Sequence, residues 1–246
     1  MTFIKPEHEN IAEILRSMDG RFLQSCGCYF GGGTAIVLKH GEYRQSLDVD
    51  FLCADTDGYR ELRMAAQRSG PAGLFGEDVK AAREPRFDRY GIRMFLVYKN
   101  QPIKFEIVRE ERIPVSGELD ENLGVPVLST SDMFAEKLLA NADRCLDRAV
   151  AYRDAIDLGR LVMAYGEIPT SAVAKAERAY GESVEIYAVK IVNHLLQKKE
   201  VLHAADVLQM SREDAFDAIA ALRADVRRLW PDGVEDEPED GSDYSF

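Results

Sequence analysis

The spacing of apolar residues changes near residue 130 and divides the chain into two parts. Before that point, short apolar or alternating runs predict strands, and amphipathic stretches between them predict helices. After it, apolar residues keep a helical spacing as far as residue 230. We therefore expect an α/β (α+β) fold in which a small mixed sheet flanked by helices is followed by a helical bundle.

The positions of the expected elements follow from these runs. In the first part we expect strands over residues 27–30, 47–53, 86–89, 92–98, 103–108 and 125–128, and helices over residues 11–23, 34–39 and 59–69. In the second part we expect helices over residues 132–144, 152–165, 171–180, 184–198, 203–209 and 213–230. These elements suggest a first domain over residues 1–130, a helical domain over residues 131–230, and a disordered acidic tail over residues 231–246.

Alternation in the strand over residues 47–53 places two acids on one face. Val49 and Phe51 point to one side, while Asp48 and Asp50 point to the other, because side chains alternate along a strand. Two carboxylates held this close repel each other unless a cation lies between them or one is protonated. The pair is therefore a candidate cation site.

A second strand carries an acid that packing alone does not require. In residues 103–108 the residues Ile, Phe and Ile share one face, whereas Glu106 lies on the other. If this strand neighbours the strand with Asp48 and Asp50, three carboxylates come together. Mg²⁺ prefers such oxygen ligands. Two metal ions held by carboxylates can serve nucleotidyl transfer by polarising the α-phosphorus and neutralising the pyrophosphate that leaves. The pattern predicts Mg²⁺ (or Mn²⁺) as cofactor and a nucleoside triphosphate (NTP) as substrate.

Three glycines, Gly31, Gly32 and Gly33, end the first expected strand, and a helix is expected to begin at Thr34. A glycine turn that leads into a helix N-terminus lets phosphate oxygens approach backbone N–H groups and the positive end of the helix dipole. A glycine triplet alone is weak evidence, because most such turns only reverse the chain. Its position directly before the strand with the two acids makes the combination more specific.

Charge argues against a broadly basic nucleic-acid surface, because the net charge is −12. Seven of the acids lie between Trp230 and the C-terminus, where there is no Lys or Arg; without them the net charge is −5. A body this mildly acidic can still carry a basic cleft.

The remaining composition indicates an ordinary cytoplasmic protein. The four cysteines are not paired at zinc-ligand spacing, and we expect them to be buried free thiols. The N-terminus has no apolar run typical of a secretory signal, and no stretch is apolar enough to span a membrane. We therefore expect cytoplasmic localisation and no membrane partner.

Two segments resemble a known family. GGTAIVLKHGEYRQSLDVDF resembles the GGTAL…R-x-S-x-D-x-D signature of the nucleotidyltransferase superfamily, and within it the AbiEii/AbiGii toxin family of type IV toxin–antitoxin systems. DMFAEKLLANADRCLDRAVAYRDAIDL resembles the helical block of the same family, which ends in R-D-x-x-D-L. Together the segments cover most of residues 29–160. The resemblance implies a polymerase-beta-like core and metal-dependent NTP chemistry.

The resemblance also implies residue roles. Gly32, Gly33 and Thr34 would lie beside the phosphates, and Lys137 would contact them. Asp48 and Asp50 would bind metal, with Glu106 as a less distinctive third ligand. Residues expected to support the site are Arg44, Ser46, Arg144, Asp154 and Asp157.

The charged residues of the helical block allow two interpretations. Lys137, Arg144 and Arg148 share one face of an unbroken helix. In that helix Arg153, Asp154 and Asp157 would lie on the opposite side. Either the helix breaks near residues 146–152, or these three residues form salt bridges between helices.

The function that we favour is transfer of a nucleoside monophosphate from an NTP to a macromolecular acceptor, and the resemblance implies that the protein is the toxin of a type IV system. The resemblance suggests tRNA, another RNA end or a protein hydroxyl as acceptor, and a cognate antitoxin as partner. One alternative is a small-molecule nucleotidyltransferase of the aminoglycoside type, which an acidic surface would suit. Another is a nucleotide-binding regulator without turnover.

Overall fold

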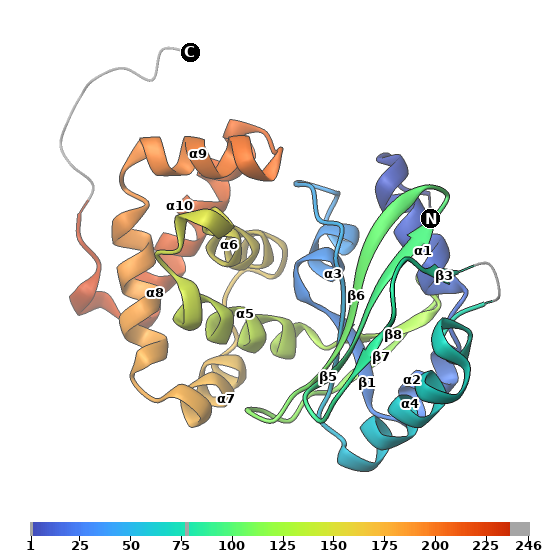
Figure 1. Ribbon diagram of the computed structural model, residues 1–246. Coiled ribbons are helices and arrows are strands. Elements are labelled where there is room, and N and C mark those ends of the chain that lie inside the picture. The colour runs from blue at the N-terminus through green and yellow to red at the C-terminus, as the bar shows by residue number, and fades with distance from the viewer. Residues whose placement is uncertain (1, 77–78, 237–246) are drawn as a thin grey trace.

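A mixed sheet and a cluster of helices lie side by side in the computed structural model, which describes residues 2–76 and 79–236 (Figure 1). Helices α1, α2 and α4 lie on one side of the sheet, and α3 with the helical half lies on the other. The expected α/β class is confirmed. The strands are β1 (Cys28–Gly31), β2 (Val49–Cys53), β3 (Lys80–Ala81), β4 (Arg86–Phe87), β5 (Gly91–Tyr98), β6 (Gln101–Arg109), β7 (Gly117–Asp120) and β8 (Val125–Leu128).

The sheet brings together strands that are far apart in the chain. Their order is β3-β5-β6-β2-β1-β8-β7, and β4 also pairs with β5. β2 runs parallel to β6 and antiparallel to β1, so β2 lies inside the sheet between the hairpin strand and the first strand. The short edge strands β3 and β7 were not expected, because their sequences KA and GELD carry no strand pattern and only pairing with a neighbour makes them extended.

The hairpin between β5 and β6 agrees with the expected turn near residues 99–102. Lys99 and Asn100 both have positive φ, at 47° and 65°, which is typical of the two-residue turn whose twist matches that of its strands. The turn fixes the register in which Arg93 pairs with Glu106.

The helices follow the expected order with shifted ends. They are α1 (Pro6–Arg16), α2 (Gly20–Ser25), α3 (Gly32–Lys39), α4 (Thr56–Ser69), α5 (Thr130–Arg144), α6 (Arg153–Tyr165), α7 (Thr170–Tyr180), α8 (Ser183–His194), α9 (Lys198–Leu208) and α10 (Arg212–Leu229). Short 3-10 turns occur at η1 (Gly70–Gly73), η2 (Arg148–Val150) and η3 (Pro231–Gly233).

The prediction of one N-terminal helix over residues 11–23 is wrong. The chain breaks after Arg16, and Asp19 caps a new helix by accepting hydrogen bonds from the N–H groups of Arg21 and Phe22. Gly20 lies against the backbone of Gly124, where a Cβ would come within 2.2 Å of a carbonyl oxygen. Apolar spacing continues through the break, so periodicity alone did not reveal it.

The first residues of the acidic tail are packed, contrary to the expected disorder. The amide of Asn193 donates to the carbonyl of Gly233 at 2.9 Å, and the guanidinium of Arg227 donates to that of Glu235 at 2.7 Å. Residues 237–246 lie outside the described residues.

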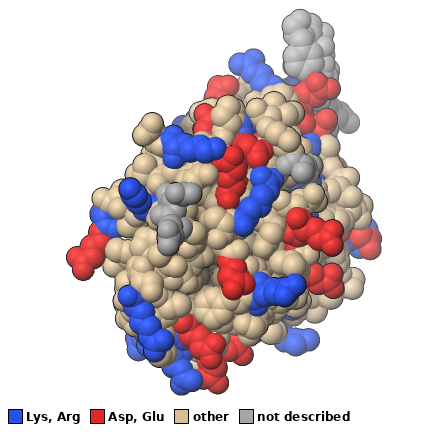
Figure 2. Space-filling view, turned by 90° about the vertical axis from the view of Figure 1, so that its right-hand side faces the viewer, with Lys and Arg blue, Asp and Glu red and all other residues tan. Residues whose placement is uncertain are grey.

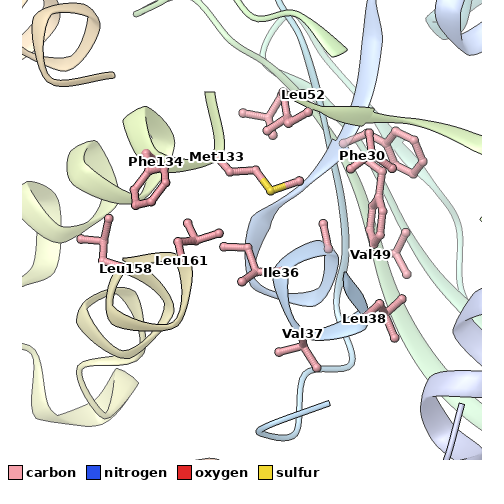
Figure 3. Close-up of a cluster of buried hydrophobic side chains, with 14 of the residues drawn as sticks. Phe30, Ile36, Val37, Leu38, Val49, Leu52, Met133, Phe134, Leu158 and Leu161 are labelled. Carbon is pink, nitrogen blue, oxygen red and sulfur yellow. The ribbon is translucent and has the colours of Figure 1, made fainter. Parts of the chain in front are cut away.

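The apolar core is continuous between the two halves of the chain. Figure 3 shows Ile36 of α3 beside Met133 of α5 and Leu161 of α6, with Phe30 and Val49 of the sheet on the opposite side of α3. Each of these side chains is at least nine-tenths buried. Helix α3 therefore joins the sheet to the helical half, and its N-terminus lies where the two meet.

Candidate active site

A cavity of about 270 Å³ lies where β2, β6, α3, α5 and α6 meet. Most of the sequence-predicted site residues line it: Gly32, Gly33, Arg44, Ser46, Asp48, Asp50, Glu106, Lys137 and Arg144. Asp154 and Asp157 lie directly behind this lining, bonded to it.

The acids of the two strands meet as the alternation predicts. β2 and β6 are neighbours in parallel register, with Asp50 opposite Glu106. Asp48, one residue before β2, faces the same cavity. On the other face of β2, Val49 and Phe51 are fully buried in the core, which holds the strand in the register that points the acids at the cavity.

Asp50 and Asp48 are not bound directly by any cation of the cavity wall, although the charges of Lys104 and Lys137 act on Asp50 from a distance. Within the described part of the chain, neither side chain has a hydrogen bond or an ion pair. Burial, and then the charge of Asp48, raise the pKa of Asp50 to about 6. A cation bound between the two carboxylates would relieve both effects, so this pair fits a divalent metal.

Glu106 is less free to bind metal than the sequence suggests. Arg93 donates to its Oε1 at 2.9 Å, and the ammonium of Lys104 contacts its Oε2. Among the described residues, no three His, Cys, Asp or Glu side chains are arranged to hold a metal ion together. Glu106 would have to leave these cations before it could join Asp48 and Asp50.

The glycine turn approaches these acids through its backbone. Gly32 has φ +69°, and a Cβ there would lie 3.0 Å from Oδ2 of Asp50. A Cβ on Gly33 would lie 2.1 Å from Nη2 of Arg44 and 3.2 Å from Oδ2 of Asp157. Only glycine fits at both positions, and the first turn of α3 therefore opens onto the cavity beside the acids.

Thr34 lies behind the glycine turn rather than in the cavity. Its side chain is buried, and its hydroxyl shares a 2.8 Å hydrogen bond with that of Ser46. Ser46 itself faces the cavity. The Thr34 side chain thus positions Ser46, and the expected place of Thr34 beside the phosphates stays a prediction.

Arg44 anchors the loop before β2 to helix α6. Its guanidinium donates to Asp157 through Nε at 2.7 Å and Nη2 at 2.8 Å, and the hydroxyl of Tyr43 donates to the same carboxylate at 2.6 Å. Arg44 and Asp157 are both buried. This pair fixes the distance between the helical half and the loop before β2, which also carries Asp48.

Lys137 is a buried member of the same network. Its ammonium lies 2.9 Å from Asp154 and 2.6 Å from Asp157, and Arg144 also binds Asp154, at 2.7 Å. Burial opposes ionisation of Asp154, but Lys137 and Arg144 hold its pKa well below the usual range. Lys137 therefore has a structural role, and its contact with phosphate stays a prediction.

Both interpretations of the helical block hold in part. The helix ends at Arg144, and α6 begins at Arg153, so the block is not one helix. Asp154 and Asp157 form salt bridges between helices, as the second interpretation required. Arg148 points away from the cavity and pairs with Glu200 at 3.0 Å, so the expected basic face does not extend to it.

Sequence reasoning missed part of the cavity wall. Lys104, Arg112, Glu136 and Arg153 also line it. Arg112 bridges Glu110 and Glu136, and burial and Glu110 raise the pKa of Glu136 to about 8. The spacing of Glu136, Ala140 and Arg144 is a signal that could have placed Glu136 on the same helix face as Arg144.

Comparison with known proteins agrees with this architecture. JHP933 from Helicobacter pylori superposes with a TM-score of 0.55 at 19% identity, over 92% of this chain and 94% of that one. A Helicobacter pylori protein described as a candidate nucleotidyltransferase gives 0.54 at 19% identity, over 92% and 97% of the two chains. These similarities show a shared fold. No curated protein matches the chain.

A family model described as "Nucleotidyl transferase AbiEii toxin, Type IV TA system" matches residues 13–243. The match includes the glycine turn, both acid-bearing strands and the helices of the second half. The chain therefore belongs to the AbiEii nucleotidyltransferase toxin family.

Proposed function

We propose that the protein transfers a nucleoside monophosphate from an NTP to a macromolecular acceptor, an RNA end or a protein hydroxyl, and that it acts as the toxin of a type IV system. The observation that carries the proposal is the convergence of Asp48, Asp50 and the α3 glycine turn on one cavity. Carboxylates without internal partners, beside a helix N-terminus that no described side chain caps, suit a metal-bound triphosphate.

Each part of the cavity wall has a role in this proposal. Asp48 and Asp50 would hold Mg²⁺ or Mn²⁺, which when bound polarises the α-phosphorus and neutralises pyrophosphate. Gly32 and Gly33 leave room for phosphate oxygens against the first turn of α3. Glu106 joins the acids if it exchanges its ion pairs with Lys104 and Arg93.

The outer surface bears on the acceptor. On the face shown in Figure 2, Lys and Arg side chains are interspersed with Asp and Glu, and neither sign forms a broad patch among the described residues of that face. Long-range attraction of an RNA backbone to this face would be weak. We therefore expect no large acceptor footprint on this face, which lies on the side of α1, α2 and α4.

A labelling experiment tests the proposal. The protein is incubated with each α-labelled NTP, Mg²⁺, and either total tRNA or cell-extract proteins, beside the variants Asp48→Ala and Asp50→Ala. Label on a macromolecule, lost in both variants, supports the proposal. Label found only on an added aminocyclitol would make the protein a small-molecule nucleotidyltransferase, and NTP binding with no transfer would make it a regulator.

Toxicity is tested separately in cells. Induced expression of the intact chain should arrest growth, and the Asp48→Ala variant at equal abundance should not. Co-expression of a neighbouring gene that restores growth would identify the antitoxin. Growth arrest by the Asp48→Ala variant would contradict a toxin that acts through nucleotidyl transfer.

A further inference from the structure

One guanidinium of the cavity wall has no partner within the protein. The cations that line the cavity are Arg44, Lys104, Arg112, Lys137, Arg144 and Arg153. All but one of them are neutralised by carboxylates of the chain. Among the described residues, Arg153 makes no hydrogen bond or ion pair, although it is half-buried.

The lack of a partner is unexpected from the sequence. Arg153 precedes Asp154 directly and lies one helical turn before Asp157, a spacing at which an arginine and an aspartate on a helix commonly pair. Both aspartates are already bound by other cations of the chain. Asp154 is bound by Lys137 and Arg144.

Asp157 is likewise occupied, by Arg44, Tyr43 and Lys137. The two aspartates that would otherwise neutralise Arg153 are thus bound by other residues of the buried ion-pair network. Its guanidinium is left at the cavity wall with its charge uncompensated, which is costly for a half-buried group unless a ligand provides the anion.

The place of Arg153 indicates which anion this is. Residues 153 and 157 lie on one face of α6, and Asp157 lies beneath Gly33, within 3.2 Å of the position its Cβ would take. Arg153 is therefore the first residue on the face of α6 that borders the glycine turn. Asp48 and Asp50, also without internal partners, line the same cavity.

We infer that Arg153 binds a phosphate oxyanion of the substrate, and that this phosphate belongs to the NTP. The uncompensated charges of the cavity then complement one ligand: the two aspartates face its metal ion, and the guanidinium faces its triphosphate through a planar fork of donors. The inference rests on the proposed function and adds a binding residue to it. The acceptor backbone offers the same chemistry, and the experiment separates the two sources.

The test compares Arg153→Ala and Arg153→Lys with the intact protein, and Arg148→Ala serves as matched control. Arg148 lies five residues earlier, is exposed, and pairs with Glu200 away from the cavity. Equilibrium binding is measured for ATP, GTP, CTP and UTP with Ca²⁺, for inorganic tripolyphosphate, for the matching nucleosides and for total tRNA. Unfolding temperature is measured for every variant.

Loss of one charge-assisted contact should weaken binding of the preferred NTP and of tripolyphosphate by about 10- to 100-fold in Arg153→Ala. Arg153→Lys should fall between, because it keeps the charge without the fork. Nucleoside binding should not change, and the unfolding temperature of the ligand-free protein should not fall, since the side chain has no structural partner and its uncompensated charge is costly. Arg148→Ala should bind all ligands as the intact protein does.

The outcomes separate the inference from the function beneath it. Weaker tRNA binding with unchanged NTP binding would keep the phosphate contact but assign it to the acceptor, which overturns the commitment to the NTP. Unchanged binding of both would overturn the contact altogether while leaving nucleotidyl transfer intact. If the unaltered protein binds no nucleotide, the proposed function itself fails.

Discussion

The aspartates in the cavity and behind it have pKa values that are shifted in opposite directions. Asp154 and Asp157 are buried and each is bound by two cations, so their pKa values lie below the usual range. Asp50 is half-buried and forms no ion pair with any described residue, and its pKa is raised to about 6 by burial and by the charge of Asp48. The same residue type is therefore a structural anion behind the cavity and a candidate metal ligand in front of it.

The raised pKa of Asp50 predicts a pH-dependent stability in the absence of metal. Between pH 4 and pH 6 the unfolded chain ionises at this residue while the folded protein stays protonated, so stability falls as pH rises through this range. Asp50→Asn removes the effect and should raise the free energy of unfolding at pH 7.5 by about 2 kcal/mol. Urea unfolding of both proteins in EDTA at pH 4.5 and 7.5 measures this difference in the free energy of unfolding.

The exposed Asp206 provides a control for this comparison, because Asp206→Asn should leave the pH profile unchanged. Equal stability of Asp50→Asn and the unaltered protein at pH 7.5 would show that the carboxylate is already well solvated. Nucleotidyl transfer by Asp50→Asn should be lost regardless of its stability.

Removal of Lys137 should damage the fold as well as the site. Lys137→Met leaves Arg144 as the one cation on Asp154 and Arg44 as the one cation on Asp157 among the described residues, and breaking a buried ion pair costs about 3–5 kcal/mol. Lys39→Met removes a partly exposed pair with Asp120 and should cost less than about 1 kcal/mol. Urea unfolding of both variants measures the two losses of stability. Similar small losses would mean that the network tolerates a carboxylate with one cation fewer.

At the scale of elements, helix α3 and the glycine turn before it determine how closely the sheet and the helical half approach. Figure 3 shows apolar side chains of α3 in contact with both. At its N-terminus the turn has no side chains, and the guanidinium of Arg44 passes directly beneath Gly33. The absence of side chains at the turn therefore allows Arg44 to pack against it and also leaves room for a ligand in the cavity.

A methyl group on Gly33 should disrupt this contact. In Gly33→Ala the new Cβ would lie 2.1 Å from Nη2 of Arg44, so the guanidinium must move off Asp157. We expect a loss of more than about 2 kcal/mol of stability and a loss of transfer activity. Gly76→Ala is the control, since its nearest neighbour, the Cβ of Ser17, is 3.6 Å away. An unfolding temperature for Gly33→Ala equal to that of the control would contradict a rigid Arg44–Asp157 pair.

At the scale of the whole molecule, the two halves share one core and one ion network. Arg44 of the first half and Asp157 of the second are buried against each other, 113 residues apart in the chain. In the described part of the chain no helix is long and apolar enough to cross a membrane.

A fragment of residues 1–129 should therefore not fold as a stable unit. It would expose Ile36 to water and remove the carboxylate that binds Arg44, and both changes cost stability. We expect the fragment alone to lack a cooperative urea transition, and co-expression with residues 130–246 to restore one. A cooperative transition in the isolated fragment would show that the first half is an independent domain.

Local chemistry in the sequence was sufficient for the class of fold and for the acids of the site. Alternation along residues 47–53 and 103–108 placed Asp48, Asp50 and Glu106 on the faces where they are found, because side-chain direction in a strand depends only on position. The glycines before Thr34 predicted a helix that begins at a turn. These features arise within a few residues, where the sequence acts directly.

The tertiary structure alone decided which charges are available to a ligand. Sequence spacing could not show that Lys137 and Arg144 are occupied by Asp154, that Glu106 is bound by Lys104 and Arg93, or that Arg153 has no partner. Ion pairing is a competition among all charged groups that the fold brings within a few ångströms. Its outcome depends on contacts between distant segments, and so the free charges of the cavity were determined only when the sheet and the helical half came together.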